Sequence, residues 1–370
     1  MAERTKGEEI IAGLKARGIF PYSISKLNAI DGCLKEAFYS YKCKDDRRNR
    51  EQSIYGIMGG EIHEVLERIY NKEATADDLL PAMQKELADA DLCGIDFPKD
   101  FKGGTAIRDS WIADMTHFCN NFDMLPGDNF TTEEFVLLKI SDTRYLIGYV
   151  DLIQVVDIEN KVVDIYDFKT SSMFKKDDLM HHGRQLVVYG MAMEQAGYTV
   201  RNLAWIMLKY VEVTFEGYAR SNSKNKSTIT KVIQRGKIAK ELSGQVERML
   251  DEAGYSELDT EILVANFIDK NSFDVLPVEI AKEFEIKQYI QPYDFTEELQ
   301  QEALDYINVH ADAFEELWKK PEDEWTPVDI GEKGQSFYCN NLCSHRSVCP
   351  ELRQYNAMLE LDKTEDEDLF

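Results

Sequence analysis

Two short stretches, Gly148-Tyr149-Val150-Asp151 and Asp167-Phe168-Lys169, are the most informative part of the sequence. Each lies in a run rich in β-branched and aromatic residues, which predicts strands over 145–156 and 162–168. Asp167 and Lys169 are two positions apart and therefore face the same side of a strand, and pairing of the two strands would bring Asp151 toward them. Two convergent carboxylates suit a hard divalent cation, and a nearby lysine can orient water and stabilise negative charge. The alternative is that both aspartates end strands and Lys169 forms an ordinary salt bridge.

The residues around these strands predict a mixed α/β layer. An earlier strand is expected over 135–140, and short polar turns join the three strands in antiparallel order. A helix over 179–196 and a strand over 203–213 follow. Helices are also expected over 59–72, 79–90 and 107–122, and Ser25 is placed to cap a helix near the N-terminus. The order helix, three strands, helix, strand is that of an α/β core.

Composition limits the class of protein. The 370 residues are 44% hydrophobic and 30% charged, as in soluble globular proteins. No apolar run approaches the about 18 residues of a membrane span, and the first residues lack a signal-peptide core, so we expect a cytoplasmic protein without membrane contact. The formal net charge of −25 excludes a generally basic nucleic-acid binder. We expect one domain over residues 1–350, with helical insertions at about 73–130 and 240–330. An acidic tail over 351–370 follows, expected to be disordered from Asp362 onward.

Two further features lie on predicted helices. His63 is beside the apolar stripe of the helix expected over 59–72. Gln185 and Tyr189 are four positions apart in the helix that follows Asp167 and Lys169, so they share a face. A single histidine in such a place is more often structural than a ligand, and a Gln/Tyr pair is equally compatible with a packed helix face. Neither feature alone identifies a function.

Together these motifs resemble the RecB-like branch of the PD-(D/E)XK nuclease superfamily. In that branch a helical histidine, an aspartate in a G-x-x-D strand, a D-x-K strand end and a Q-x-x-x-Y helix occur in this order. The corresponding residues here are His63, Asp151, Asp167 with Lys169, and Gln185 with Tyr189. The resemblance covers roughly residues 20–350 and implies a restriction-endonuclease-like α/β core with helical insertions.

The resemblance also implies a role for each of these residues. His63, Asp151, Asp167 and the backbone carbonyl of Phe168 would hold the catalytic Mg²⁺ or Mn²⁺. Lys169 would serve the nucleophilic water, and Gln185 and Tyr189 would contact DNA. An outer carboxylate could come from Glu133 or Glu134 at the start of the first strand.

Four cysteines form a second candidate site. Cys339, Cys343 and Cys349 lie within eleven residues, and Cys33 is the comparably placed distant cysteine. The pattern resembles the iron–sulfur subgroup of this branch, which includes the AddB nuclease domain and the nucleases of CRISPR spacer acquisition, and it implies a [4Fe–4S] clasp between the ends of the fold. Four thiolates can also hold zinc, and the third possibility is that these cysteines are buried structural thiols without a metal. The other cysteines are expected to be ordinary thiols, and His345 is expected at the surface.

These features predict a metal-dependent DNA exonuclease acting on DNA ends in recombination, repair or phage-type DNA processing. The alternatives are a structure-specific endonuclease and a non-catalytic DNA-binding scaffold. The segment 218–240 is basic and has no acidic residue, so it is either a solvated loop or a DNA path. Its candidate DNA contacts are Lys224, Lys226, Lys231 and Arg235. No GxxxxGK[ST] motor motif is present. A helicase, annealing or single-strand-binding protein is therefore a reasonable partner, in a bacterial or phage-infected cytoplasm.

Overall fold

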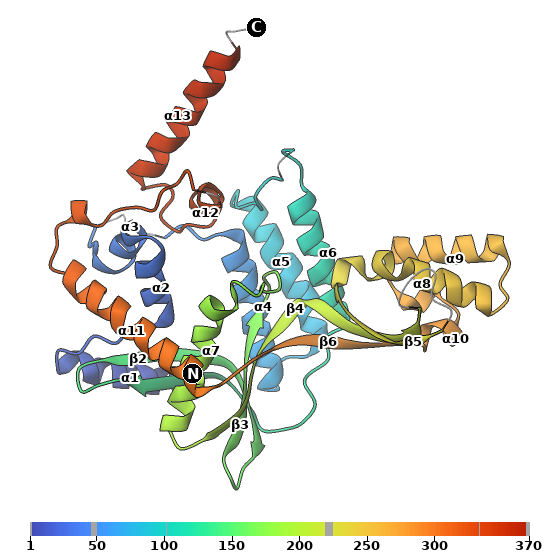
Figure 1. The fold of residues 1–370 in the computed structure, drawn as a ribbon, viewed down its shortest axis with the longest axis horizontal. Helices are drawn as coiled ribbons and strands as arrows, with labels where there is room; N and C mark the ends of the chain where they lie inside the picture. Colours follow the sequence, from blue (N-terminus) through green and yellow to red (C-terminus); the bar gives the residue numbers. More distant parts are fainter. Residues whose placement is uncertain (1, 46–49, 101, 219–224, 333, 368–370) are drawn as a thin grey trace.

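A mixed sheet forms the centre of the computed structural model, which describes residues 2–45, 50–100, 102–218, 225–332 and 334–367 (Figure 1). In these residues the sheet has six strands in the order β1-β2-β3-β4-β5, and β6 pairs with β4. The strands are β1 (Phe130–Lys139), β2 (Tyr145–Asp157), β3 (Val162–Lys169), β4 (Thr199–Gly217), β5 (Ser227–Gln234) and β6 (Phe284–Tyr293). The predicted antiparallel order of the first three strands is confirmed. The helix α7 (Leu179–Gln195) then returns the chain so that β4 runs parallel to β3.

Helices cover both faces of this sheet. One face packs against α2 (Ile24–Gly32), α7 and α11 (Glu297–Leu317), and the other packs against α4 (Ile54–Tyr70), α5 (Leu79–Leu92) and α6 (Ala106–Asn120). The remaining helices of the main body are α1 (Ala2–Ala16), α3 (Leu34–Ala37), α12 (Gln335–Asn341) and α13 (Pro350–Glu367). Side chains on both faces of β2, β3 and β4 are buried, so these strands hold their polar side chains in fixed positions.

The helix α4 begins five residues before the predicted start. Ser53 is its N-cap, and the Ser53 hydroxyl accepts a hydrogen bond from the Gly56 N–H at 3.2 Å. Its buried residues recur at helical spacing: Ile54, Met58, Ile62, Val65, Leu66 and Ile69. This stripe packs on the sheet and sets the rotation of the helix. His63, next to Ile62, consequently lies at the border between the packed face and solvent.

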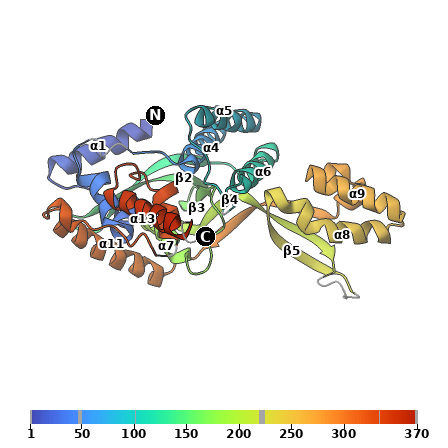
Figure 2. The ribbon, with the colours of Figure 1, turned by 90° about the horizontal axis from the view of Figure 1, so that it is seen from above.

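The second half of β4 leaves the main body and forms an arm with β5, β6, α8 (Ile238–Glu252), α9 (Glu257–Lys270) and α10 (Val278–Ala281) (Figures 1 and 2). Its core is separate from the two clusters on the central sheet and includes Val213, Phe215, Leu242 and Phe267. The strands β5 and β6 are not among the predicted elements. In β5, Ile229 and Ile233 alternate with polar residues, and the basic composition of this segment conceals a strand pattern.

Two predictions near the ends of the chain are wrong. The cap of α2 is Ser23, which accepts from the Lys26 N–H at 3.2 Å, and Ser25 lies inside the helix. The tail predicted to be disordered from Asp362 is helical through Glu367, as the last part of α13, which stands away from the main body (Figure 1). Residues 368–370 lie outside the described residues. No helix in the described part of the chain is both long and apolar enough to cross a membrane.

Candidate active site

The predicted metal residues meet at the end of β3. Asp151 of β2 accepts a hydrogen bond from the Phe168 N–H, with 2.8 Å between the nitrogen and Oδ2. The same oxygen lies 3.4 Å from Nδ1 of His63, on α4. The Phe168 backbone also hydrogen-bonds His63, and Lys169 forms an ion pair with Asp167. Side chains from α4, β2 and β3 therefore share one small site. The strand pattern predicted the approach of Asp151 to Asp167 and Lys169, and only the resemblance placed His63 with them.

Burial sets the protonation of these groups. The pKa of Asp151 is raised well above its ordinary value, first by burial and then by the negative charge of Asp167. Burial alone would lower the pKa of Lys169, but the neighbouring Asp167 and Asp151 carboxylates outweigh it and raise that pKa. Burial lowers the pKa of His63, so its imidazole is neutral at pH 7, which is the form that binds metal ions.

The donor set suits a divalent cation. Asp167 is 2% exposed, and its Oδ2 contacts the Lys169 ammonium but makes no hydrogen bond of normal geometry within the described residues. Two carboxylates and a neutral imidazole are ligands that Mg²⁺ and Mn²⁺ accept. In the described ranges, however, no three His, Cys, Asp or Glu side chains lie close enough to hold an ion without moving. Binding would require Asp167 to turn from Lys169 toward the cation.

Metal binding is expected to strengthen as pH rises. A cation must displace the proton that the raised pKa retains on Asp151, so metal uptake releases a proton and is favoured at higher pH. His63 does not have to lose a proton when the metal binds, because its lowered pKa keeps it neutral. We expect Mn²⁺ to raise the melting temperature more at pH 8 than at pH 5.5, with Asp151→Asn losing most of this increment. An equal increment at both pH values would contradict the assignment of Asp151 as a ligand.

Gln185 and Tyr189 lie together on α7. The Gln185 amide Nε2 donates to the Tyr189 hydroxyl at 2.8 Å. Tyr189 is 6% exposed, and its ring lies directly over Gly148 of β2. Burial raises the pKa of Tyr189, so its phenol stays protonated. Gln185 is only half-buried and is therefore the member of the pair that is better placed to reach a ligand.

The contact with Tyr189 explains why a glycine precedes Asp151 by three positions. A Cβ on residue 148 would lie 2.5 Å from Cε1 of Tyr189, which is far inside van der Waals contact. We expect Gly148→Ala to displace the ring and to lower the free energy of unfolding by about 2 kcal/mol. Gly60→Ala is the matched control, because nothing lies within 4 Å of its Cβ and alanine favours a helix. Thermal unfolding of both variants checks this, and equal stability would contradict it.

Of the two glutamates at the start of β1, Glu133 and Glu134, only Glu133 has a charge that affects the pKa of Asp151. Thr132 pairs with Leu152 and Glu134 with Val150, so the register continues unshifted across Glu133 and places it opposite Asp151. Its φ of 51° is in the left-handed region, where a glutamate is strained by about 1 kcal/mol. The negative charge of Glu133 contributes to the raised pKa of Asp151. Nothing in the residue pattern signals this left-handed backbone conformation.

The four predicted cluster cysteines line one cavity of about 20 Å³, although Cys33 and Cys339 are far apart in sequence. Burial raises the pKa of Cys339 to about 11 and that of Cys343 to about 12, and neighbouring thiols add to both shifts. The cavity has room for about one water molecule. The described thiols do not form a metal site as they stand. A bound cluster would therefore require the residues that line this cavity to rearrange.

The prediction that His345 lies at the surface is wrong. Its ring is 1% exposed, packs against Tyr39 with centroids 5.5 Å apart, and shares a hydrogen bond of 2.9 Å with the Ser40 hydroxyl. Of the other cysteines, Cys43 and Cys119 are buried and Cys93 is exposed. His345 therefore belongs to the packed wall beside the cysteine cavity.

The predicted basic contacts are placed very differently. Lys224 lies outside the described residues. Lys226 is exposed and forms an ion pair with Glu252 at 2.5 Å, and Lys231 is half-exposed on β5. Arg235, predicted as a DNA contact, is only 3% exposed and is therefore not available for one. Its guanidinium donates to the Leu208 carbonyl at 2.9 Å and to Gln288 Oε1 at 2.7 Å, and contacts His117 Nδ1 at 3.2 Å. Arg235 therefore joins the arm to the main body.

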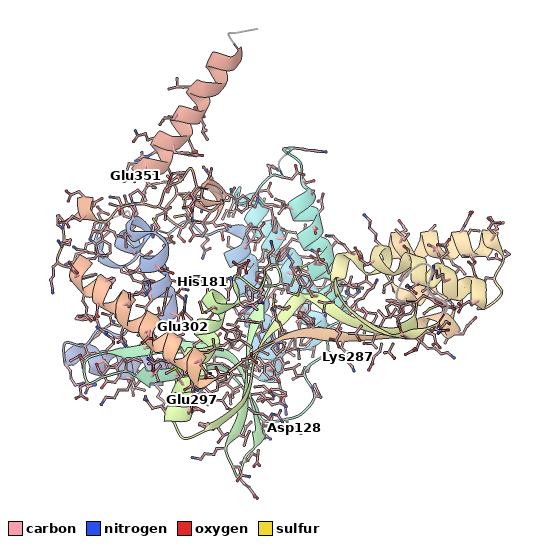
Figure 3. The ribbon with its side chains drawn as sticks, viewed as in Figure 1. Asp128, His181, Lys287, Glu297, Glu302 and Glu351 are labelled. Atoms are coloured by element: carbon pink, nitrogen blue, oxygen red, sulfur yellow. The ribbon has the colours of Figure 1, made fainter. Side chains whose placement is uncertain are left out.

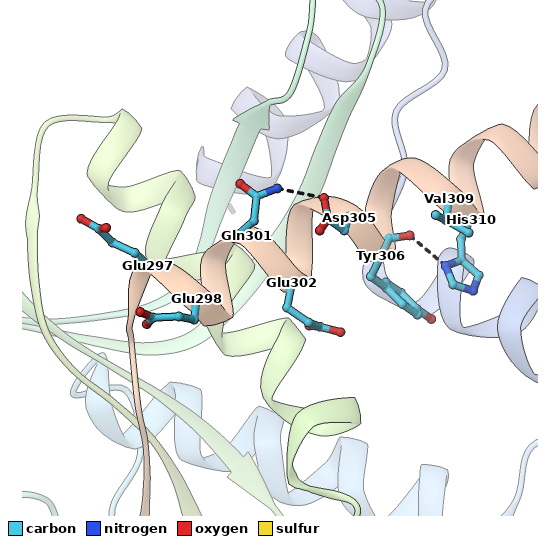
Figure 4. A pocket seen from close by; sticks show the side chains of 8 residues that line it. All are labelled: Glu297, Glu298, Gln301, Glu302, Asp305, Tyr306, Val309 and His310. Atoms are coloured by element: carbon cyan, nitrogen blue, oxygen red, sulfur yellow. Dashed lines mark hydrogen bonds between the residues drawn. The ribbon is translucent and has the colours of Figure 1, made fainter.

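A pocket on α11 has a different chemical character, because acidic side chains line it (Figure 4). Four carboxylates line it, from Glu297, Glu298, Glu302 and Asp305. None of its lining residues belongs to the predicted site. A surface of this charge repels a polyanion and is not a DNA path.

Comparison with known proteins gives one relevant finding. The family model described as the PD-(D/E)XK nuclease superfamily matches residues 21–350. Among curated proteins, none matches the chain. The matched range includes the helix of His63, the three strands, α7 and the cysteine cavity.

Proposed function

The chain belongs to the PD-(D/E)XK nuclease superfamily, and we propose that it hydrolyses DNA phosphodiester bonds with Mg²⁺ or Mn²⁺. The single observation that carries this proposal is the meeting of His63, Asp151, Asp167 and Lys169 at the end of β3. The superfamily is generally nucleolytic, so a nuclease is the activity that family and site favour together.

The residues of the site divide the work of hydrolysis. His63, Asp151, Asp167 and the Phe168 carbonyl would hold the cation, which lowers the pKa of water and polarises the phosphate. The Phe168 N–H fixes the Asp151 carboxylate, and the buried β3 fixes Asp167 and Lys169. The raised pKa of Lys169 keeps it charged, so it can orient the attacking water and stabilise the charge that develops on the phosphate.

We further propose that the chain belongs to the RecB-like branch and acts as an exonuclease at DNA ends. The order of the His63, Asp151, Asp167/Lys169 and Gln185/Tyr189 motifs along the chain supports the branch. Gln185, Lys226 and Lys231 are the described residues proposed to contact DNA. Tyr189 would act through Gln185, to which it is hydrogen-bonded. A cytoplasmic location and a separate helicase, annealing or single-strand-binding partner complete the proposal.

The cysteine cavity is proposed to hold a [4Fe–4S] cluster, as in the iron–sulfur subgroup. The support is that one N-terminal and three C-terminal cysteines line the same cavity. Zinc is the alternative occupant, and a purely structural thiol cluster is the third. The group would join the two ends of the fold and would take no part in hydrolysis.

Digestion of end-labelled DNA tests the proposed activity. Linear and covalently closed circular DNA, single- and double-stranded, are incubated with Mg²⁺, Mn²⁺ or EDTA. We expect metal-dependent loss of linear DNA and survival of the circles. Cleavage of circles would favour the endonuclease alternative, and binding without cleavage would favour the scaffold.

A further inference from the structure

His182 stands beside the candidate active site on a rigid support. It lies in the first turn of α7, and its ring stacks on Phe174 with centroids 3.9 Å apart and planes 18° from parallel. Phe174 in turn packs edge-on against Trp205 of β4 at 4.8 Å. The Phe174 carbonyl accepts a hydrogen bond from Gln291 Nε2 at 3.3 Å. The orientation of the imidazole is therefore set by the sheet through two aromatic rings.

The backbone near His182 is held equally closely. A Cβ on Gly183 would lie 2.1 Å from the ring of Tyr293 at the end of β6, so the first turn of α7 is pressed against that strand. The His182 N–H donates to the Asp178 carbonyl at 3.2 Å. These contacts leave the helix start little freedom to shift.

The ring nitrogens of His182 have no hydrogen-bond partner among the residues that the structure describes, although the ring is half-buried. The charges of Lys169 and Asp167 reach it, as does that of the adjacent His181. Burial, with His181 and Lys169, lowers its pKa to about 4. At neutral pH the imidazole is therefore uncharged and carries one N–H donor without an acceptor. A buried or half-buried donor that is fixed but unpaired gains most from a ligand that accepts.

We propose that His182 is a positioning residue that donates a hydrogen bond to a phosphate oxygen of the DNA strand held at the metal site. This rests on the proposed function, because it requires DNA to lie along the end of β3. The charges of Lys169 and Asp167 act on His182, so an acceptor bound near Lys169 can lie within its reach, and a phosphodiester oxygen is such an acceptor. Lys175 and Lys176 are exposed on the same connecting loop, but the exposed Asp177 and Asp178 balance their charge, so the proposal rests on the His182 ring itself.

Three variants separate the contact from a structural role. His182→Phe keeps an aromatic ring on Phe174 but removes both nitrogens. His182→Gln restores an N–H donor. His181→Phe is the matched control, because His181 is the exposed neighbour at the start of α7 (Figure 3). Binding of a labelled single-stranded oligonucleotide is measured in an Asp167→Asn background with Mn²⁺, and KM and kcat are measured with Asp167 intact.

We expect His182→Phe to raise Kd and KM by about 10-fold and to leave kcat within about 2-fold, because the contact is equal in ground and transition states. His182→Gln should recover most of this loss, and His181→Phe should lose nothing. Unchanged Kd in His182→Phe, or an equal loss in His181→Phe, would overturn the proposal. A fall in kcat alone would also overturn it. If the protein with Asp167 intact cuts no DNA but His182→Phe still loses binding, the proposed function fails and this contact stands.

Discussion

Asp167→Asn is expected to reduce metal-dependent DNA cleavage at least about 1000-fold while the protein stays folded. The substitution keeps the size of the side chain and removes the charge that a cation requires. Asp167 is buried, but its Oδ2 has no hydrogen bond of normal geometry in the described structure, so little stabilisation depends on it. The loss of its ion pair with Lys169 is offset in part, because Asp151 remains near Lys169 and is relieved of repulsion.

Asp164 provides the matched control on the same strand. It is as buried as Asp167, at 1% exposed. Its carboxylate accepts from Arg201 Nε at 2.9 Å, Asn202 Nδ2 at 3.0 Å and the Tyr166 hydroxyl at 3.3 Å. Asp164→Asn breaks the charged part of this network and is expected to lower the free energy of unfolding by about 2 kcal/mol, with cleavage retained.

The pair of variants therefore predicts opposite outcomes for two buried aspartates three positions apart. Cleavage of an end-labelled oligonucleotide with Mn²⁺ and thermal unfolding without metal measure the two effects. Cleavage that survives in Asp167→Asn would remove the hydrolytic assignment of this site. A large loss of stability in Asp167→Asn would show that its role is structural, as we assign to Asp164.

The core of the candidate site could be predicted because it depends on short-range geometry. The alternation of a strand places Asp167 and Lys169 on one side, and a short turn between β2 and β3 requires them to pair and brings in Asp151. His63 could be assigned to a helix but not to this contact. Its distance from Asp151 depends on how α4 packs on the sheet, and the helix pattern does not predict that packing. Only the family resemblance indicated that His63 belongs to the site.

Other features depend on partners far away in the sequence. Arg235 was predicted as a DNA contact because it lies in the basic segment 218–240. Its burial depends on His117 and Gln288, which lie 118 and 53 positions away. The strand β5 has a weak pattern by itself, and its pairing with the projecting half of β4 stabilises it. The position of Glu133 opposite Asp151 is similar, since only the register of β1 against β2 reveals it.

The cysteine cavity leads to the other large expected effect. If it holds a metal group, that group connects Cys33, after α2, to a C-terminal segment that begins about 300 residues later. Such a connection stabilises strongly, because it closes a very long loop and its binding free energy becomes folding free energy. The Cys339 and Cys343 thiols would not repel each other when the group is lost, because burial raises the pKa of both and keeps them protonated.

Cys343→Ser is therefore expected to lose most of the bound metal and to melt at least about 10 °C lower, whereas Cys93→Ser, at an exposed thiol, should match the unaltered protein in both respects. Iron, sulfide and zinc are assayed in protein purified without oxygen. Four iron and four sulfide per chain would support the cluster, and one zinc would replace it with the alternative. If the protein contains no metal, and Cys343→Ser and Cys93→Ser melt at the same temperature, the cysteines are structural thiols only. Without a metal no loop is closed, so replacing one thiol by a hydroxyl cannot open it.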